Sequence, residues 1–376
     1  MKKKIFFNGL NELRAFAAIA VIIHHIELFK LRDNFGSIYN YSLTNYVIKH
    51  IGKSGVILFF VLSGFLITFL LLQEKEKHGR ILFKKFFFRR IFRIWPLYYL
   101  IFFISFFILP IIATNFEIFT HSPYYYNLIT NPENYNIRSF FLYVLFVPNL
   151  AVAIGDLIPG ASQSWSIGVE EQFYIIWPIL MAFFSKKRIV YAMAFLFLFL
   201  VLIAAFYTSF ISKALSIIPF EYMCVGGFGG YFYFKNKDDI LKLSHKKSLH
   251  FINVLLIVIF LSVQIFPLYF QKLILSFLFL FQILFTINDH NSSALRSSIF
   301  SFLGKISYGI YMYHPIVLFL VFSVVNKYVK EKAHILTYNL LIYIFVFGLT
   351  FLLSHLSYKY IETYFIKIKD EKFKSL

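Results

Sequence analysis

Apolar stretches of about 20 residues recur along the whole chain, and this pattern restricts the fold more than any single motif does. Of the 376 residues, 59% are hydrophobic and 15% are charged, whereas about 25% are charged in a typical soluble domain. A helix of about 20 apolar residues crosses the hydrocarbon core of a bilayer and makes its backbone hydrogen bonds internally. The sequence therefore predicts an all-α, polytopic membrane protein.

We expect about ten transmembrane helices and one short segment that is re-entrant or interfacial. The short segment, 138–150, cannot cross the bilayer alone and is interrupted by Pro148. The expected spans lie near 10–29, 55–73, 88–110, 166–184, 188–208, 214–234, 251–267, 272–288, 303–325 and 337–358.

The distribution of lysine and arginine predicts the orientation of these spans. With ten spans and both termini in the cytoplasm, every basic stretch lies on the cytoplasmic side, as the positive-inside rule requires. Treating 138–150 as an eleventh span would move basic stretches outside. The net charge of +19 therefore reflects membrane orientation rather than nucleic-acid binding. The basic stretches are Lys2–Lys4, Lys75–Arg93, Lys186–Arg188, Lys235–Lys247 and Lys359–Lys374.

The chain shows neither an internal repeat nor an appended soluble domain, so we expect one integral-membrane domain over residues 1–376 in the inner (plasma) membrane. No cleavage site follows Lys2–Lys4, which predicts an uncleaved first helix. The largest outer loops are expected at about 30–54 and 111–165. Cys224 is the only cysteine, which excludes an internal disulfide and a cysteine metal cluster, and no metal site is expected.

Arg14 and His25 stand out inside the first apolar segment. Eleven residues at about 100° each come within about 20° of three full turns, so both side chains point to one side of a helix, about 16 Å apart along its axis. Ionisable groups within a membrane helix are costly without a partner and mark functional sites by default. His24 points about 80° away from Arg14 by the same arithmetic, which singles out His25.

Arg89, Arg90 and Arg93 open the third expected span at the cytoplasmic surface. Their spacings of three and four residues allow one shared face, and cations at a helix N-terminus oppose its dipole. A polyanionic partner is attractive there, because arginine forks match phosphate oxygens. Ordinary positive-inside anchoring is the alternative interpretation.

Further polar residues map to the outer half of the expected bundle. Glu170 and Glu171 follow Trp165, and His314 lies midway along a later span. The two acids are interpreted either as first-turn residues favoured by the helix dipole or as carboxylates that orient a histidine or hold a hydroxylated substrate. Asn149, beside Pro148, is expected to face a water-filled cavity, because irregular backbone at membrane depth needs polar partners.

Ser63, in the second expected span, has two interpretations. It either hydrogen-bonds between helices, with Gly64 allowing a close approach, or supports the site.

In this arrangement the chain resembles the acyltransferase-3 family of bacterial membrane O-acyltransferases over nearly its whole length. Five matching pieces stand in the family's order, which is more specific than any one of them. They are Gly9–Ala15 leading to His25, then Phe59–Thr68, then Arg89-Arg90 with Arg93 and Pro96, then Trp165-Ser166 with Glu170 and Phe173-Tyr174, and finally Ser307-Tyr308 with His314-Pro315.

The resemblance implies acyl-CoA, usually acetyl-CoA, as co-substrate, with no permanently bound cofactor. It implies a hydroxyl of a surface carbohydrate or glycolipid as acceptor. It also implies that His25 is catalytic and that Arg14 and the three arginines Arg89, Arg90 and Arg93 serve the donor. We assign Glu170 as a second catalytic group that orients the imidazole or binds the acceptor, with Trp165, His314, Asn149 and Ser63 as acceptor-binding or supporting residues.

A transporter or flippase for a lipid-linked or acylated sugar is the rival class, because a polytopic topology with intramembrane charges fits it equally well. A carrier has no need of CoA, so the arginine cluster combined with His25 favours the enzyme. A non-catalytic membrane scaffold leaves Arg14 and His25 unexplained.

Overall fold

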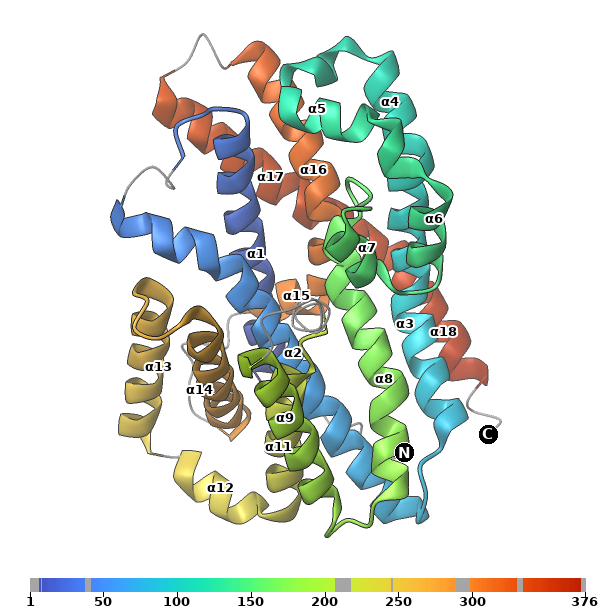
Figure 1. The fold of residues 1–376 in the computed structure, drawn as a ribbon, viewed down its shortest axis with the longest axis vertical. Coiled ribbons are helices and arrows are strands. Elements are labelled where there is room, and N and C mark those ends of the chain that lie inside the picture. Colours follow the sequence, from blue (N-terminus) through green and yellow to red (C-terminus); the bar gives the residue numbers. More distant parts are fainter. Residues whose placement is uncertain are drawn as a thin grey trace. The chain divides into compact units, whose positions relative to one another are not determined.

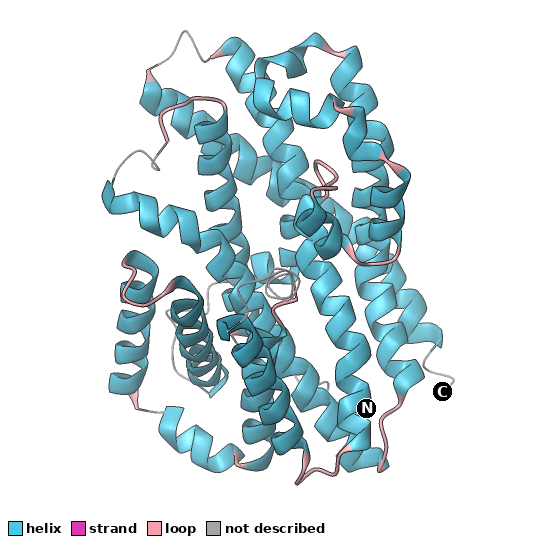
Figure 2. Cartoon of the chain, in the orientation of Figure 1, coloured by secondary structure: helices cyan, strands magenta, loops and turns pink. Residues whose placement is uncertain are grey.

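The computed structural model describes residues 7, 9–37, 42–206, 218–244, 246–288, 298–329 and 334–372. Every regular element in these ranges is a helix, and they contain no strand (Figure 2). The all-α prediction is therefore confirmed. Lys2–Lys4 and the ends of two expected spans, 207–208 and 214–217, lie outside the described residues.

The chain divides into two compact units. Unit 1 comprises Met1–Val21, Lys49–Ile81 and Phe173–Lys305, and unit 2 comprises Ile22–Ile48, Leu82–Gln172 and Ile306–Leu376. The helices α1 (Leu10–Arg32), α2 (Ser42–His78) and α8 (Trp165–Phe183) each contain a boundary between the units.

Unit 1 is a helical bundle in which α11 packs against α9 and α14, and α13 packs against α14 (Figure 1). Besides parts of α1, α2 and α8, it contains α9 (Ile189–Phe206), α11 (Phe220–Lys235), α12 (Lys237–Ser244), α13 (Lys247–Ser262), α14 (Leu268–Asn288) and α15 (Ser298–Lys305).

Glycines bring α2 and α11 together within unit 1. A Cβ added to Gly64 would collide with the backbone of Met223, and one added to Gly226 would collide with the backbone of Val61. Backbones that approach this closely are typical of membrane helix pairs, whose interfaces favour small residues.

Unit 2 holds the remaining helices, and its most buried helix is α16, which packs against α17, α3 and the short η3 and η5. The elements are α3 (Phe83–Phe103), η2 (Ile104–Ile108), α4 (Leu109–Asn115), η3 (Glu117–His121), α5 (Pro123–Thr130), η4 (Pro132–Tyr135), α6 (Ile137–Val144), α7 (Pro148–Ile154), η5 (Ser162–Ser164), α16 (Ser307–Tyr328), α17 (Ile335–Ser357), η6 (Tyr358–Glu362) and α18 (Thr363–Lys372).

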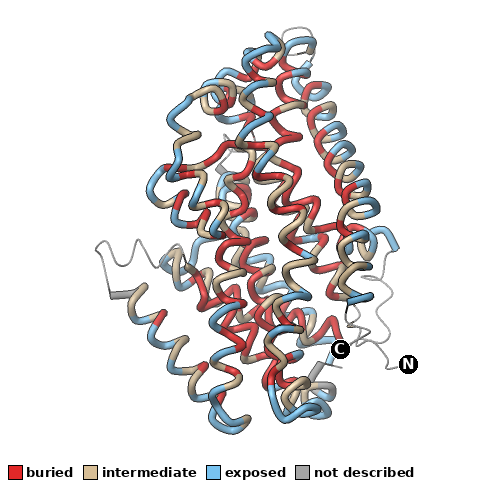
Figure 3. Tube along the Cα trace, turned by 90° about the vertical axis from the view of Figure 1, so that its right-hand side faces the viewer, coloured by how far each residue is buried: buried red, intermediate tan, exposed pale blue. Residues whose placement is uncertain are grey.

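Large apolar side chains are exposed along several helices, as lipid contact requires. Phe195 on α9 is 73% exposed and Phe251 on α13 is 69% exposed. Buried and exposed residues alternate along single helices in Figure 3. Such exposed apolar surface is unusual for a soluble monomer and normal for a membrane protein.

Five helical stretches among the described residues are long and apolar enough to cross a bilayer, which supports a multi-pass membrane protein. The number of ten spans and the cytoplasmic termini stay predictions. The five stretches are Thr44–His78, Phe83–Asn115, Leu268–Ile287, Ser307–Tyr328 and Ile335–Lys372.

Several expected boundaries differ from the structure. The expected span 303–325 is broken at Ile306, which lies between α15 and α16. The segment 138–150 is not one element, because α6 ends at Val144 and Pro148 begins α7. The expected outer loops are largely helical: α2 begins at Ser42, and α4 to α7 with η3 and η4 occupy much of 109–154.

Candidate active site

Two histidines from different helices of unit 2 lie at hydrogen-bond distance. The Nε2 atom of His314 on α16 is 3.3 Å from the Nδ1 atom of His25 on α1, and the ring centroids are 4.9 Å apart. His314 is fully buried, whereas His25 is partly exposed. The structure therefore brings together two residues that the sequence had placed only in the same half of the bundle.

The tautomer of His314 follows from its second contact. Its Nδ1 lies 2.7 Å from the carbonyl oxygen of Tyr311, and a carbonyl oxygen only accepts, so Nδ1 donates the proton. In the neutral ring Nε2 is then an acceptor, and Nδ1–H of His25 donates to it. This assignment leaves the lone pair of His25 on Nε2.

Hydrogen bonds tie the turn of α16 that carries His314 to the start of α8. The hydroxyl of Tyr311 lies 2.8 Å from Oγ of Ser166 and donates to the carbonyl oxygen of Gln163. The side chain of Gln163 donates in turn to the carbonyl oxygen of Met312 at 2.8 Å. These buried contacts hold the backbone carbonyl that orients His314.

The neighbouring His24 makes a different contact. Its Nδ1 lies 2.7 Å from the carbonyl oxygen of Ile48 and therefore donates to it, and its ring meets that of His25 edge-on at 5.0 Å. His24 thus connects α1 to the start of α2 within unit 2.

The arginine cluster lies on α3 in the same unit. Arg89 and Arg93 are exposed, and the guanidinium of Arg90 lies 5.7 Å from the centre of the Phe86 ring. Because α3 begins at Phe83, the cluster occupies its second and third turns rather than its very start.

Contacts along α16 place the arginines and the histidines at successive levels of unit 2. The hydroxyl of Tyr308 donates to the carbonyl oxygen of Ile94, which follows Arg93 on α3. Tyr311 contacts Ser166, and His314 contacts His25. Each step along α16 is three residues, or about 4.5 Å, so the histidine pair lies about 9 Å beyond the level of Ile94.

Glu171 makes two contacts at the arginine level. Oε2 of Glu171 accepts a hydrogen bond from the indole Nε1–H of Trp95 at 3.3 Å, and Arg90 is close enough for a favourable electrostatic interaction. Because α8 begins at Trp165, both glutamates lie in its second turn, so their interpretation as first-turn acids is wrong. Glu170 lies within electrostatic range of Tyr311.

Asn149 fills a local structural need. At the start of α7 it exchanges two hydrogen bonds with Gln172 of α8, of 2.8 and 3.3 Å, and Gln172 also donates to the carbonyl oxygen of Phe146. Phe146 has a positive φ of 58°, which strains a non-glycine residue. The expected polar partner of this irregular backbone is therefore a side chain of the protein.

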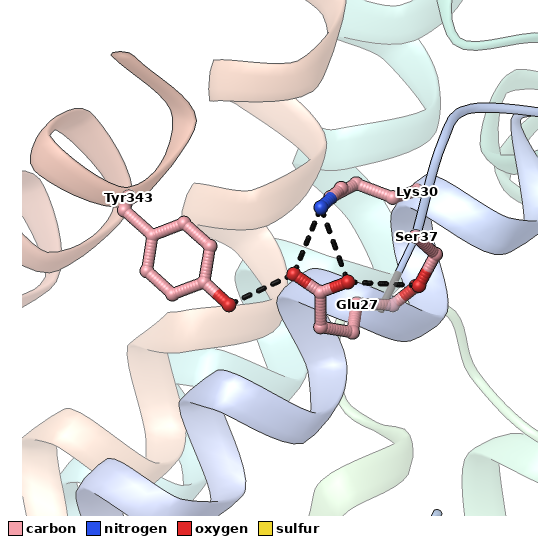
Figure 4. A network of polar contacts seen from close by, with 4 residues as sticks. All are labelled: Glu27, Lys30, Ser37 and Tyr343. Atoms are coloured by element: carbon pink, nitrogen blue, oxygen red, sulfur yellow. Dashed lines mark hydrogen bonds and ion pairs between the residues drawn. The ribbon is translucent and has the colours of Figure 1, made fainter. Parts of the chain in front are cut away.

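A buried ionic cluster holds the C-terminal end of α1 in unit 2 (Figure 4). Nζ of Lys30 lies 2.9 and 3.1 Å from the two carboxylate oxygens of Glu27, and both side chains are at most 1% exposed. The hydroxyls of Ser37 and Tyr343 donate to the same carboxylate, each at 2.8 Å. Glu27 thus fastens α1 to α17 two residues beyond His25, a contact that the sequence reasoning missed.

The other expected site residues have these positions. Arg14 lies on the unit 1 part of α1, where its guanidinium donates to Asn11 at 3.4 Å. Ser63, also in unit 1, hydrogen-bonds Tyr174 of α8 at 2.8 Å, as the interhelical interpretation predicts. Trp165 is the first residue of α8 and is partly exposed.

Metal binding finds no support in the described ranges: they contain no group of three or more His, Cys, Asp and Glu side chains arranged to hold a metal ion.

Comparison with known proteins identifies the relatives of this chain. A family model described as an acyltransferase domain matches residues 7–359. A peptidoglycan O-acetyltransferase of Listeria monocytogenes is 30% identical over 183 residues, which cover 47% of this chain and 24% of that protein. A Staphylococcus aureus protein, provisionally named an O-acetyltransferase, is 28% identical over 403 residues, covering 97% of this chain and 58% of that protein.

The chain thus matches little more than half the length of the Staphylococcus aureus protein. It matches about a quarter of the length of the Listeria monocytogenes protein. No solved structure matches it.

Proposed function

The chain belongs to the acyltransferase-3 family, and on this premise we propose that it is a multi-pass membrane O-acyltransferase of the plasma membrane. It transfers an acyl group, in the first place acetyl, from cytoplasmic acyl-CoA to a hydroxyl of a cell-surface carbohydrate or its lipid-linked precursor. The names of its relatives support O-acetylation of a cell-surface polymer. Family membership also argues against the transporter alternative. We further propose that residues 1–376 work as one integral-membrane domain.

The contact between His25 and His314 is the observation that carries this proposal. An imidazole has an ordinary pKa of about 6.5, which suits a general base near neutral pH. His25 donates its Nδ1–H to His314 in a hydrogen bond. The lone pair of its Nε2 is then the base for the acceptor hydroxyl. The ring is held by a hydrogen bond, as a catalytic base requires.

The proposed reaction is a direct transfer. Nε2 of His25 takes the proton of the acceptor hydroxyl while the oxygen of that hydroxyl attacks the thioester carbonyl carbon. The carbon–sulfur bond then breaks, and the CoA thiolate leaves and takes the proton back from the imidazolium. The products are the O-acyl ester and free CoA, so atoms and charge balance.

The remaining residues divide between donor and acceptor. We propose that Arg89, Arg90 and Arg93 bind the CoA phosphates, because charge-assisted arginine–phosphate hydrogen bonds are strong. Arg14 keeps the donor role that family membership implies. Glu170 lies one turn after Ser166 on α8, and we propose that it orients the acceptor hydroxyl.

Acyl-CoA turnover by the purified protein tests the proposal. Wild-type protein in lipid nanodiscs should release CoA from acetyl-CoA when a surface-glycan fragment is present, and mass spectrometry should find the glycan heavier by one acetyl group. His25→Ala should lose about 10²- to 10⁴-fold in kcat. His78→Ala, at an exposed site at the end of α2, is the matched control. A folded His25→Ala with the wild-type rate would contradict the assignment.

A further inference from the structure

The arginine level of unit 2 contains a buried carboxylate oxygen without a hydrogen-bond donor, one of several such buried polar atoms among the described residues. Oε1 of Glu171 is shielded from solvent and has no hydrogen-bond partner among the described residues, whereas Oε2 accepts from Trp95. A buried acceptor without a donor loses the hydrogen bonds that water would give it, and the loss is larger when it is charged, so such atoms are rare in native proteins. The donor for Oε1 of Glu171 is therefore expected to come from a bound molecule.

The position of Glu171 along the unit limits what this donor can be. Glu171 lies five residues after Ser166 on α8, or about 7.5 Å along the axis, on the side of Arg90 rather than of the histidine pair. Trp95, its hydrogen-bond partner, follows Ile94, to which Tyr308 of α16 donates. Glu171 is thus level with the arginines, and His314 lies about 9 Å further along α16.

The chemistry of acyl-CoA matches this order. Its phosphates carry negative charge, its thioester lies at the far end, and its thin pantetheine arm between them carries amide N–H groups. If phosphates lie at Arg90 and the thioester at His25, the arm passes Glu171. Amide N–H is a neutral donor, and a carboxylate oxygen accepts it strongly.

We propose that Oε1 of Glu171 accepts a hydrogen bond from an amide N–H of the pantetheine arm and so forms a donor-arm subsite beside Trp95. This inference rests on the proposed function. It assigns Glu171 to the donor, whereas Glu170 on the neighbouring position serves the acceptor. The indole of Trp95 holds the carboxylate in place by occupying Oε2.

Donor analogues test the subsite. Two acetyl-CoA analogues are used, and in each of them a different amide N–H of the pantetheine arm is replaced by an ester oxygen. An ester oxygen cannot donate a hydrogen bond. For the wild-type protein, one analogue should show a KM about tenfold above that of acetyl-CoA. Glu171→Leu should raise the KM for acetyl-CoA by a similar factor, with kcat little changed, and should no longer distinguish that analogue from acetyl-CoA.

Two further variants complete the experiment. Glu171→Gln keeps the shape and one weaker acceptor, so its KM should be intermediate, and it serves if Glu171→Leu does not fold. Glu221→Leu removes a carboxylate that is also buried, 6% exposed, on α11 of unit 1, and should leave the KM unchanged. If Glu171→Leu and the analogue raise the KM independently, so that the two factors multiply when they are combined, the subsite is overturned. The pantetheine arm and Glu171 would then not be in contact.

Binding of CoA, measured by calorimetry, separates this inference from the proposed function. Glu171→Leu should weaken CoA binding about tenfold. Suppose that the wild-type protein turns over acetyl-CoA and that Glu171→Leu binds CoA as tightly as the wild type does. This result would overturn the subsite and leave the proposed function standing. A wild-type protein that neither binds CoA nor consumes acetyl-CoA would overturn both proposals.

Discussion

His314 donates from Nδ1 to the carbonyl oxygen of Tyr311 and receives at Nε2, 3.3 Å away, the Nδ1 proton of His25. One neutral imidazole therefore sets the tautomer of another, the task that a carboxylate performs in many catalytic triads. A neutral partner leaves no buried negative charge behind, which suits a site at membrane depth.

Removal of the His314 ring should slow the reaction without weakening donor binding. His314→Ala leaves the tautomer and orientation of His25 unset, so we expect kcat to fall about tenfold to a hundredfold, as part of the contribution of a positioned base. His314→Gln retains an amide oxygen that accepts from His25 and should keep more activity than His314→Ala. Steady-state kinetics of both folded variants measures this. Equal rates for wild type and His314→Ala would show that the contact has no catalytic role.

Arg90→Ala should act on the phosphate end of the donor alone. We expect the KM for acetyl-CoA to rise about tenfold or more, because a hydrogen bond to a charged group contributes about 1.5–3 kcal/mol. The KM for S-acetylpantetheine, which lacks the nucleotide phosphates, should not change. Arg188→Ala, at an exposed residue outside the cluster, is the control. A similar loss with both donors would mean that Arg90 acts through the structure rather than through phosphate.

The helices were predictable because apolar stretches of sufficient length form helices in lipid whatever their detailed packing. The ends of α1 and α9 lie within three residues of the expected spans where the structure describes them. The break at Ile306, which lies between Lys305 and Ser307, was not predicted, because one charged and one hydroxyl-bearing residue do not by themselves end an apolar span. The helices of 109–154 were missed because each is too short to cross a bilayer.

The sequence predicted candidate site residues but not the contacts between them. Periodicity singled out His25, and His314 followed from its depth, but their contact joins residues 289 apart in sequence. The hydrogen bond between Trp95 and Glu171 depends on which face of α8 meets α3, and no spacing rule gives that. The expectation that Asn149 faces a water-filled cavity stays a prediction, and its hydrogen bond with Gln172 follows only from the packing of α7 on α8.

Asn149→Ala should destabilise the fold more than it changes catalysis. It leaves Gln172 and the carbonyl oxygen of Phe146 with fewer partners, and we expect a loss of about 1–2 kcal/mol in the free energy of unfolding. The kcat of the folded fraction should stay near the wild-type value. Asn127→Ala, at an exposed site on α5, is the control. Equilibrium unfolding in mixed micelles measures the free energy of unfolding of both variants. If Asn149→Ala keeps the wild-type stability but has a lowered kcat, Asn149 acts at the acceptor site instead.

The buried pair of Glu27 and Lys30 should tolerate double replacement better than single replacement. Lys30→Met alone leaves a buried carboxylate uncompensated and should cost about 3–5 kcal/mol, whereas Glu27→Leu combined with Lys30→Met should cost less. Lys186→Ala breaks the ion pair with Glu76, in which the two side chains are 41% and 59% exposed, and should leave stability nearly unchanged. A double variant no more stable than Lys30→Met would indicate that Ser37 and Tyr343 require the carboxylate.

Gly64→Ala should disrupt unit 1, because the new methyl group would meet the backbone of Met223 on α11. Backbone cannot move aside as a flexible side chain does, so we expect a loss of about 1–3 kcal/mol or more, with reduced yield of folded protein. Gly348→Ala, on α17 of unit 2, is the matched control, since an added Cβ there meets nothing within 4 Å.

Because alanine favours helix over glycine by about 1 kcal/mol, Gly348→Ala should be neutral or stabilising. Thermal unfolding of both variants in the same nanodiscs makes the comparison. If Gly64→Ala unfolds at the wild-type temperature, α2 and α11 are not in backbone contact, and the packing of unit 1 has to be revised.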